Sequence, residues 1–256
     1  MDPIPSGNQN GSGRSFDGGL IMIEITNLTK IFSQNGEQIV ALDKVNVVIR
    51  QGEFVSVIGP SGSGKSTFLL TIGGLIRPTS GEVRINGTSL YEVDHKERAR
   101  IRLHTLGFMF QTFNLIPYLS AIENVEVPMS LAGIPRKEQN RKARELLDRV
   151  GLSHRIKHRP AQLSVGERQR VALTRTLAND PAIILADEPT GNLDPELSKE
   201  VIGSFKQFAE NGITVVMVTH DHQNAAESSH RLQIIDGVVS ELHSREKEEH
   251  HVSKHL

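Results

Sequence analysis

The sequence predicts an α/β fold built around a parallel β-sheet. Three runs of nearly all apolar residues, at 54–58, 182–186 and 213–218, are typical of strands buried on both faces. Helical patterns separate these runs, as expected for βαβ units. Apolar and polar residues alternate at 23–25 and 45–49, which indicates further, half-buried strands.

The composition is that of an ordinary globular chain. Of 256 residues, 37% are hydrophobic, and 29 basic side chains face 30 acidic ones for a net charge of −1. This balance argues against broad electrostatic binding to nucleic acid. The lack of cysteine excludes a disulfide scaffold, a thiol enzyme and a cysteine–zinc module. No apolar run approaches the roughly 18 residues that span a bilayer, so we expect no direct membrane span.

The chain is expected to form a single folded domain over residues 22–243. Residues 1–21 are rich in Gly, Ser, Asn and Pro and are expected to be disordered or derived from an expression vector. Residues 244–256 are expected to form a flexible tail. Within the domain, residues 89–163 carry many charges and few strand-like runs, which predicts a mostly helical insertion in the α/β core.

Two helices and two hairpins can be placed from their patterns. Apolar residues at i, i+3, i+4 and i+7 predict a helix over 143–150, with a glycine directly after it as the C-terminal cap. A second apolar stripe, at 197–208, follows Asp194 and a proline, a good N-cap and first-turn pair. Asn-Gly at 86–87 and Asp-Gly at 236–237 predict hairpin turns.

Residues 59–66 match the phosphate-binding pattern G-x-x-x-x-G-K-[ST]. They follow the apolar run 54–58 directly and open an apolar helical stretch at 67–75, the context that this loop requires. Glycines let several backbone N–H groups converge on one phosphate, and the following helix adds its positive N-terminus. Lys65 is predicted to reach the β and γ phosphates, and the Ser66 hydroxyl to ligate Mg²⁺. The rival interpretation, a chance glycine-rich turn, does not explain the strand–loop–helix context.

An acidic pair, Asp187 and Glu188, ends the apolar run 182–186. Asp187 suits the metal side of a phosphate-binding site, and Glu188 suits a base that polarises the attacking water. Alone, such a pair is more often a solvated strand end. Beside a phosphate-binding loop, the catalytic interpretation is favoured.

Two more polar residues follow apolar strands: Gln111 comes after 106–110, and His220 comes after 213–218. Ligands in open α/β sheets bind at the carboxyl ends of strands, so these residues are expected to converge with Lys65 on one crevice. Taken alone, a histidine at this position is more often a turn or capping residue. A metal pair with His222 is disfavoured because no third ligand is in view.

The segment 163–170, Leu-Ser-Val-Gly-Glu-Arg-Gln-Arg, resembles the LSGGQ signature of the ATP-binding-cassette (ABC) ATPases. The other motifs agree with that family in order and spacing: the Walker A loop at 59–66, the Q-loop glutamine Gln111, the Walker B strand at 183–188, the D-loop at 191–194 and the H-loop histidine His220. The resemblance covers about residues 22–242. It implies a P-loop NTPase core with a parallel sheet, an antiparallel β subdomain and a helical subdomain.

The resemblance also implies the cofactors, ATP and Mg²⁺, and the residues that hold them. Two copies of the chain would pair head to tail as a homodimer, with each ATP between the Walker A loop of one copy and the signature of the other. The catalytic residues would be Glu188, His220 and Lys65, and the metal would be held by Ser66, Gln111 and Asp187. The residues expected to bind the nucleotide are Phe32, Gly59, Pro60, Ser61, Gly62, Ser63, Gly64, Lys65, Ser66, Thr67, Gln111, Ser164, Gly166 and Glu167.

Residues 108–115, 123–125 and 186–194 look like the ABC subgroup that serves lipoprotein release, macrolide and antimicrobial-peptide export, and cell division. The chain is thus expected to be the ATP-hydrolysing subunit of a transporter. It would drive an integral-membrane permease from the cytoplasm, peripherally on the inner face of the membrane. An alternative is a regulatory module that signals through a membrane partner without moving cargo. A soluble protein of DNA repair or translation is disfavoured, because no zinc motif, long coiled coil or second cassette is seen.

Three residues leave alternatives open. Val165 replaces the usual glycine of the signature: a β-branched residue is costly at positive φ and harmless in an ordinary helical turn, which we favour. Phe32 falls where the family has an aromatic residue that stacks on adenine, but simple packing explains it equally well. Asp194 serves the dimer interface, the cap of the following helix, or both.

Overall fold

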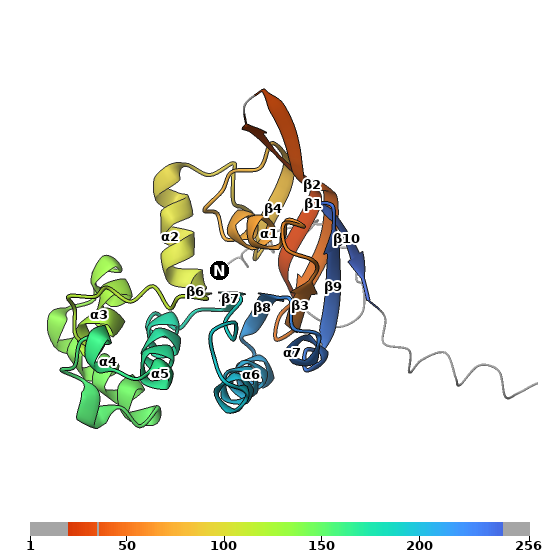
Figure 1. Ribbon diagram of the computed structural model, residues 1–256. Coiled ribbons are helices and arrows are strands. Elements are labelled where there is room, and N and C mark those ends of the chain that lie inside the picture. Colours follow the sequence, from red (N-terminus) through yellow and green to blue (C-terminus); the bar gives the residue numbers. More distant parts are fainter. Residues whose placement is uncertain (1–19, 35, 243–256) are drawn as a thin grey trace, which may run out of the picture.

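The computed structural model describes residues 20–34 and 36–242 (Figure 1). The tails expected from the sequence lie outside these residues, apart from Leu20 and Ile21, and Ile21 already begins a strand. The described residues form two β-sheets, several helices that pack on these sheets, and a separate layer of helices.

The apolar runs of the sequence form the centre of a six-stranded sheet. Its strand order is β10-β9-β3-β8-β7-β6, and every neighbouring pair is parallel except β10 with β9. Both β3 and β8 are buried along their whole length, which explains why polar residues do not alternate in them. The strands are β3 (Phe54–Ile58), β6 (Leu106–Phe110), β7 (Ile183–Asp187), β8 (Thr214–Thr219), β9 (His230–Ile235) and β10 (Val238–Glu241).

The alternating segments form a four-stranded antiparallel sheet of order β2-β1-β4-β5. Strands β1 and β2 make a long hairpin that projects from the body of the molecule (Figure 1). The predicted Asn86-Gly87 turn joins β4 to β5, and both turn residues have the positive φ of a tight hairpin. The strands are β1 (Ile21–Gln34), β2 (Glu37–Arg50), β4 (Ser80–Ile85) and β5 (Thr88–Ser89).

Apolar side chains cover both faces of the parallel sheet. Helix α1 (Lys65–Ile72) packs between the two sheets, and its buried Phe68 belongs to the core cluster that joins them. Helix α6 (Pro195–Glu210) covers the opposite face, where Phe205 packs edge-on against Phe54 with ring centroids 6.0 Å apart. A short helix, α7 (His222–Ala226), follows β8.

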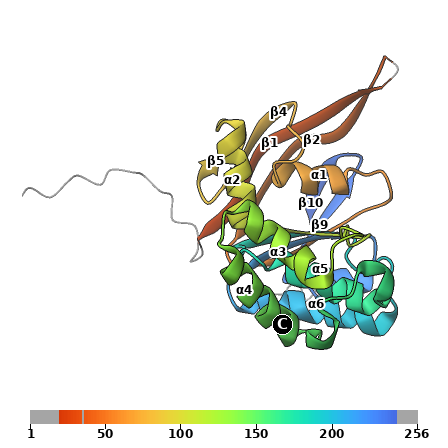
Figure 2. The same cartoon turned by 90° about the vertical axis from the view of Figure 1, so that its left-hand side faces the viewer.

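A separate layer of helices stands at one end of the sheet (Figure 2). It consists of α3 (Ala121–Leu131), α4 (Arg136–Arg149) and α5 (Val165–Thr176), with 3₁₀ turns at Ser153–Arg155 and Pro160–Gln162.

The segment 89–163 was expected to form the helical insertion, but the helical layer neither begins nor ends with that segment. The segment contains β6, which pairs with β7 in the core sheet, and α2 (His95–Thr105), whose Ile101 packs on the same core. The layer also continues past 163 into α5. A five-residue strand between charged helices is too short to alter the average pattern of such a segment.

The helix ends follow from local hydrogen bonding. Asp194 caps α6 as predicted, because its Oδ1 accepts from the backbone N–H of Glu196 and Leu197 at 3.0 and 2.9 Å. Gly151, just after α4, has φ 72, the left-handed conformation of a C-terminal cap. No helix among residues 20–34 and 36–242 is both long and apolar enough to cross a membrane.

Candidate nucleotide-binding site

The glycine-rich loop runs from the end of β3 to the start of α1 and lies tightly against its neighbours. A Cβ on Gly59 would stand 2.2 Å from the Ile234 carbonyl oxygen, and one on Gly64 2.2 Å from that of Ala41. Gly64, which precedes α1, also has φ 107. Only glycine fits these two positions, so the loop can wrap the first turn of α1 and direct backbone N–H groups toward an anion.

Lys65 and Ser66 stand at that first turn. The Lys65 side chain is buried, and its Nζ donates to the carbonyl oxygens of Gly59 and Pro60 at 2.9 and 2.8 Å, which holds the ammonium over the loop. Ser66 Oγ donates to Asp187 Oδ1 at 3.1 Å. A hydroxyl and a carboxylate side by side are oxygen ligands of the kind that Mg²⁺ prefers, so this donor set fits the ion.

Asp187 ends β7 and is half-buried. Burial raises the pKa of its carboxyl, and the neighbouring charge of Glu188 raises it further, while the hydrogen bond from Ser66 and the charge of Lys65 oppose these effects. The carboxyl is therefore held in surroundings where a cation is strongly favoured.

Glu188 and His220 meet because β7 and β8 are adjacent. His220 Nδ1 lies 2.9 Å from Glu188 Oε2. Glu188 has φ 46, a left-handed backbone that is unusual for this residue type, and its N–H donates to the Val218 carbonyl at 3.0 Å. Strained backbone conformations of this kind are common at functional sites, where contacts with the surrounding structure hold them in place.

Gln111 lies at the end of β6, beside the D-loop. Asn192 Nδ2 donates to the Gln111 carbonyl at 3.2 Å, and the Gln111 side chain covers Gly191 so closely that a Cβ there would stand 2.8 Å from Nε2. The four strands β3, β8, β7 and β6 are consecutive neighbours, so the ends that carry Lys65, His220, Asp187, Glu188 and Gln111 lie along one edge, as expected.

The signature begins α5. Ser164 is its N-cap: Oγ accepts from the Glu167 N–H at 3.2 Å, and Glu167 Oε2 accepts from the Ser164 N–H at 2.8 Å. Val165 is the first helical residue and is not among the described residues with positive φ, so the valine costs the backbone nothing. A Cβ on Gly166 would approach Leu197 of α6 to 3.0 Å.

The signature and the Walker A loop are not hydrogen-bonded to each other within one chain, as far as the described residues extend: no hydrogen bond joins residues 164–167 to residues 59–67. Phe32 is 38% exposed on β1 and belongs to none of the three core clusters among the described residues. The Lys30 ammonium lies 4.8 Å from its ring centroid.

Sequence reasoning missed several residues that shape the site. Arg155 Nε donates to Glu167 Oε1 at 2.9 Å, and Asn224 Nδ2 of α7 donates at 3.1 Å to Thr190 Oγ1, just before the D-loop. Arg175 donates to the turn after Gln111. These contacts join residues that are distant in the chain and belong to no local pattern, so only the packing of the helices reveals them.

The loop, the acidic strand end and their sheet define a P-loop nucleoside triphosphatase. The family model described as ABC transporter matches residues 42–191. The chain belongs to the ABC transporter family, as the subunit that binds and hydrolyses ATP.

Several relatives are similar in sequence to this chain over most of its length. It is 41% identical to the lipoprotein-releasing system ATP-binding protein LolD of Geobacter metallireducens, over 85% of this chain and 97% of that protein. It is 42% identical to the macrolide export ATP-binding/permease protein MacB of Hyphomonas neptunium, over 85% of this chain but 34% of that longer protein. A solved dimer of the ATP-binding cassette MJ0796, bound to ADP and Pi after hydrolysis, matches with a TM-score of 0.79 and 43% identity, over 87% of this chain and 100% of that one.

Proposed function

We propose that two copies of this chain pair head to tail and hydrolyse two MgATP at their interface to drive a permease. The observation that carries this proposal is the Glu188–His220 contact of 2.9 Å at a strand end whose Asp187 is hydrogen-bonded to Ser66 of the Walker A loop. A second copy would bring its own Ser164 and Gly166 to the open side of the loop. The dimeric form of the MJ0796 cassette supports this arrangement.

In the proposed site, the loop N–H groups and Lys65 hold the phosphates, and Ser66, Asp187 and Gln111 hold Mg²⁺. When bound, Mg²⁺ would neutralise charge that develops on the phosphate oxygens. Glu188 would accept a proton from a water as the water oxygen bonds to the γ-phosphorus and the bridging P–O bond breaks. His220 would hold the Glu188 carboxylate and the γ-phosphate in line. Phe32 would stack on the adenine with the ring face that Lys30 leaves open.

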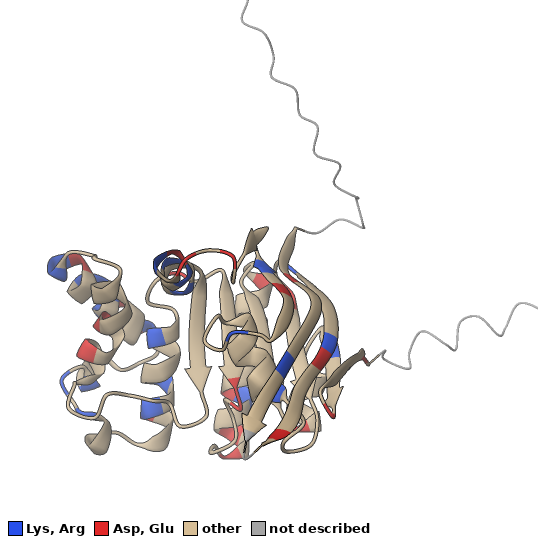
Figure 3. Cartoon of the chain, turned by 90° about the horizontal axis from the view of Figure 1, so that it is seen from above, with Lys and Arg blue, Asp and Glu red and all other residues tan. Residues whose placement is uncertain are grey.

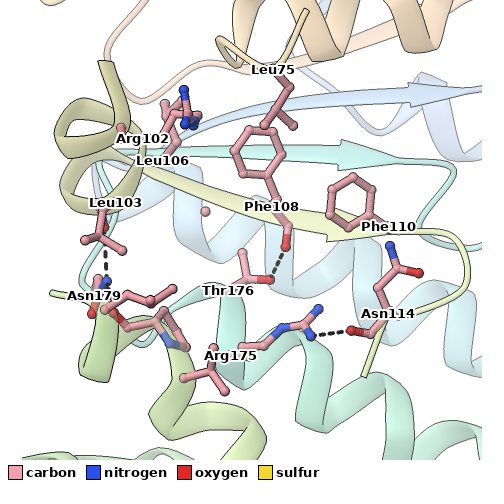
Figure 4. Close-up of a pocket in the computed structure, with 15 residues that line it drawn as sticks. Leu75, Arg102, Leu103, Leu106, Phe108, Phe110, Asn114, Arg175, Thr176 and Asn179 are labelled. Carbon is pink, nitrogen blue, oxygen red and sulfur yellow. Dashed lines mark hydrogen bonds between the residues drawn. The ribbon is translucent and has the colours of Figure 1, made fainter. Parts of the chain in front are cut away.

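We further propose that the permease docks in an apolar groove between the core and the helical layer (Figure 4). Its walls come from α2, β6, α3 and the end of α5, and two cationic side chains, Arg102 and Arg175, stand among apolar residues such as Phe108 and Leu131. Basic residues are also concentrated on α2 (Figure 3). Two of the relatives are named for macrolide export and for a lipoprotein-releasing system. By analogy, this chain would drive export of, or mechanical work on, a lipoprotein, drug or peptide cargo from the cytoplasmic face of a membrane.

The test is the Glu188→Gln variant, which keeps the shape of the side chain but cannot accept the proton. We expect the variant to bind ATP, to elute as a dimer with ATP and Mg²⁺, and to hydrolyse ATP about 100-fold or more slowly than the wild type. Turnover near the wild-type rate would remove Glu188 from its role.

The same variant, locked with ATP, should capture a permease from detergent-solubilised membranes. Recovery of nucleic-acid or ribosomal partners in place of a membrane protein would refute the transport assignment. Recovery of a permease with a cell-wall hydrolase would favour signalling.

A further inference from the structure

The turn that follows β6 has an unfavourable backbone. Phe113 and Asn114 are consecutive residues with φ 60 and 46. The left-handed region is tolerated by asparagine but disfavoured for a phenylalanine. Such a turn persists only where its surroundings fix it. The residues that fix this turn therefore control the position of Gln111, two residues before it.

Arg175 is the side chain that holds this turn. Its Nη1 donates to the Asn114 carbonyl at 2.6 Å (Figure 4), and its Nη2 donates to the Phe113 carbonyl at 2.7 Å. The planar guanidinium presents two donors in a fixed fork, so it can bind both carbonyls only while they point the same way. Inside the turn, Thr112 Oγ1 bonds to Asn114 Oδ1 at 2.7 Å, a contact that is too local to choose the direction of the carbonyls.

The charge of Arg175 depends on these carbonyls. Among residues 20–34 and 36–242, no carboxylate lies within ion-pair distance of its guanidinium. Burial lowers the pKa of the group. A half-buried cation without a carboxylate must be satisfied by dipoles, which makes the Arg175–turn contact costly to break.

The position of Arg175 links three motifs. It lies in the last turn of α5, the helix that Ser164 of the signature begins. The turn that it holds leads back to Gln111, which is bonded to Asn192 of the D-loop. Arg175 also lines the apolar groove, so the groove and the turn share one guanidinium.

We propose that Arg175 is a positioning residue: its fork fixes the left-handed turn at Phe113–Asn114 and thereby sets Gln111 against the D-loop. The catalytic consequence rests on the proposed function of Gln111, whereas the hold on the turn does not. The signature helix and the Q-loop then move as one unit, because α5 is rigid between Ser164 and Arg175.

Hydrogen exchange measured by mass spectrometry on the full chain tests the hold on the turn. In Arg175→Met, which keeps the length of the side chain and loses the fork, we expect the amides of residues 111–116 to exchange about tenfold faster or more. Asn179→Ala is the matched control. Asn179 lies just past the same helix and donates to the carbonyls of Leu103 and Pro128, both at 3.0 Å, which are outside the turn. Exchange at 111–116 should keep its wild-type rate in this control.

Steady-state kinetics tests the consequence. In Arg175→Met, we expect kcat to fall about tenfold while the affinity of the chain for an ATP analogue stays within about twofold, since the loop at 59–66 makes the phosphate contacts. Arg175→Lys, which can bond one carbonyl at a time, should recover part of the loss.

Two results would overturn the proposal. One is wild-type exchange at 111–116 in Arg175→Met. The other is equal acceleration in Asn179→Ala, which would indicate general loosening. If Arg175→Met does not fold, Arg175→Lys carries the test, and it must show faster exchange confined to the turn. A wild-type chain without ATPase activity would refute the proposed function and leave the exchange result to decide this inference.

Discussion

Replacing Gly191 by alanine should displace the Gln111 side chain and leave the fold intact. Gly191 is not among the described glycines with positive φ, so its backbone accepts alanine. The new Cβ would stand 2.8 Å from Gln111 Nε2 and 3.5 Å from the next two atoms of that side chain. The atom that must yield is the far end of a flexible side chain, so we expect little loss of stability.

The size of the effect follows from the displacement. Gln111 Nε2 must retreat by roughly half an ångström before the contact becomes ordinary, and a misplacement of about 1 Å near a reacting group can cost about 100-fold in rate. We therefore expect kcat to fall by about three- to tenfold. The affinity for ATP should change little, because the nearest atoms that the new Cβ meets all belong to Gln111 and none to the phosphate-binding loop.

A double-mutant cycle with Gln111→Ala separates this displacement from other effects. ATPase rates of the four proteins should show that Gly191→Ala has no further effect once the glutamine is shortened. Melting temperatures of all four should agree within about 3 °C. An equal loss of kcat in the wild-type and Gln111→Ala backgrounds would refute the reasoning, since the alanine at position 191 would then act through some other group of the D-loop.

Two further predictions concern stability. Phe205→Ala removes a fully buried ring that packs on Phe54, so the free energy of unfolding should fall by about 3–5 kcal/mol in urea titrations, and a loss below about 1 kcal/mol would contradict the packing. His230 has a raised pKa because the Glu53 carboxylate lies 3.7 Å from its Nδ1, an effect that outweighs the opposing burial. A raised folded-state pKa adds stability below about pH 6.5 that is lost as the pH rises through that pKa, so His230→Gln should destabilise the protein more at pH 6 than at pH 9, by up to about 1 kcal/mol, and equal losses at both values would contradict it.

The strands that carry the site were predictable because their burial pattern is local. β3, β7 and β8 each appear as one apolar run, and a run buried on both faces has few alternatives to a central parallel strand. The helical layer was predicted less well. β6 is five residues long, and its pairing with β7 depends on residues more than 70 positions away.

Some residues of the candidate site were likewise predictable from the sequence, and others were not. Lys65, Asp187, Glu188 and His220 were predicted to share one crevice because each follows a strand or the loop, and the carboxyl ends of parallel strands meet at one edge. The left-handed φ of Glu188 could not be predicted from the sequence, because glutamate rarely adopts that conformation. The contact between Arg175 and the turn was also not predictable, because an arginine in the last turn of a helix is ordinarily a solvated side chain.

At the N-terminus of α5, the signature residues cap the helix and are also proposed to bind a phosphate. Glu167 places a carboxylate at the N-terminus of α5, where it would repel a phosphate. The backbone N–H of Ser164 contributes most to the lowered pKa of Glu167, and the Arg155 guanidinium adds to it, so the carboxylate is ionised at neutral pH but neutralised by its partners. Ser164 Oγ accepts only the Glu167 N–H, which leaves its hydroxyl proton to donate. Capping and the proposed phosphate binding therefore use opposite capacities of one hydroxyl, and valine at the first helical position interferes with neither.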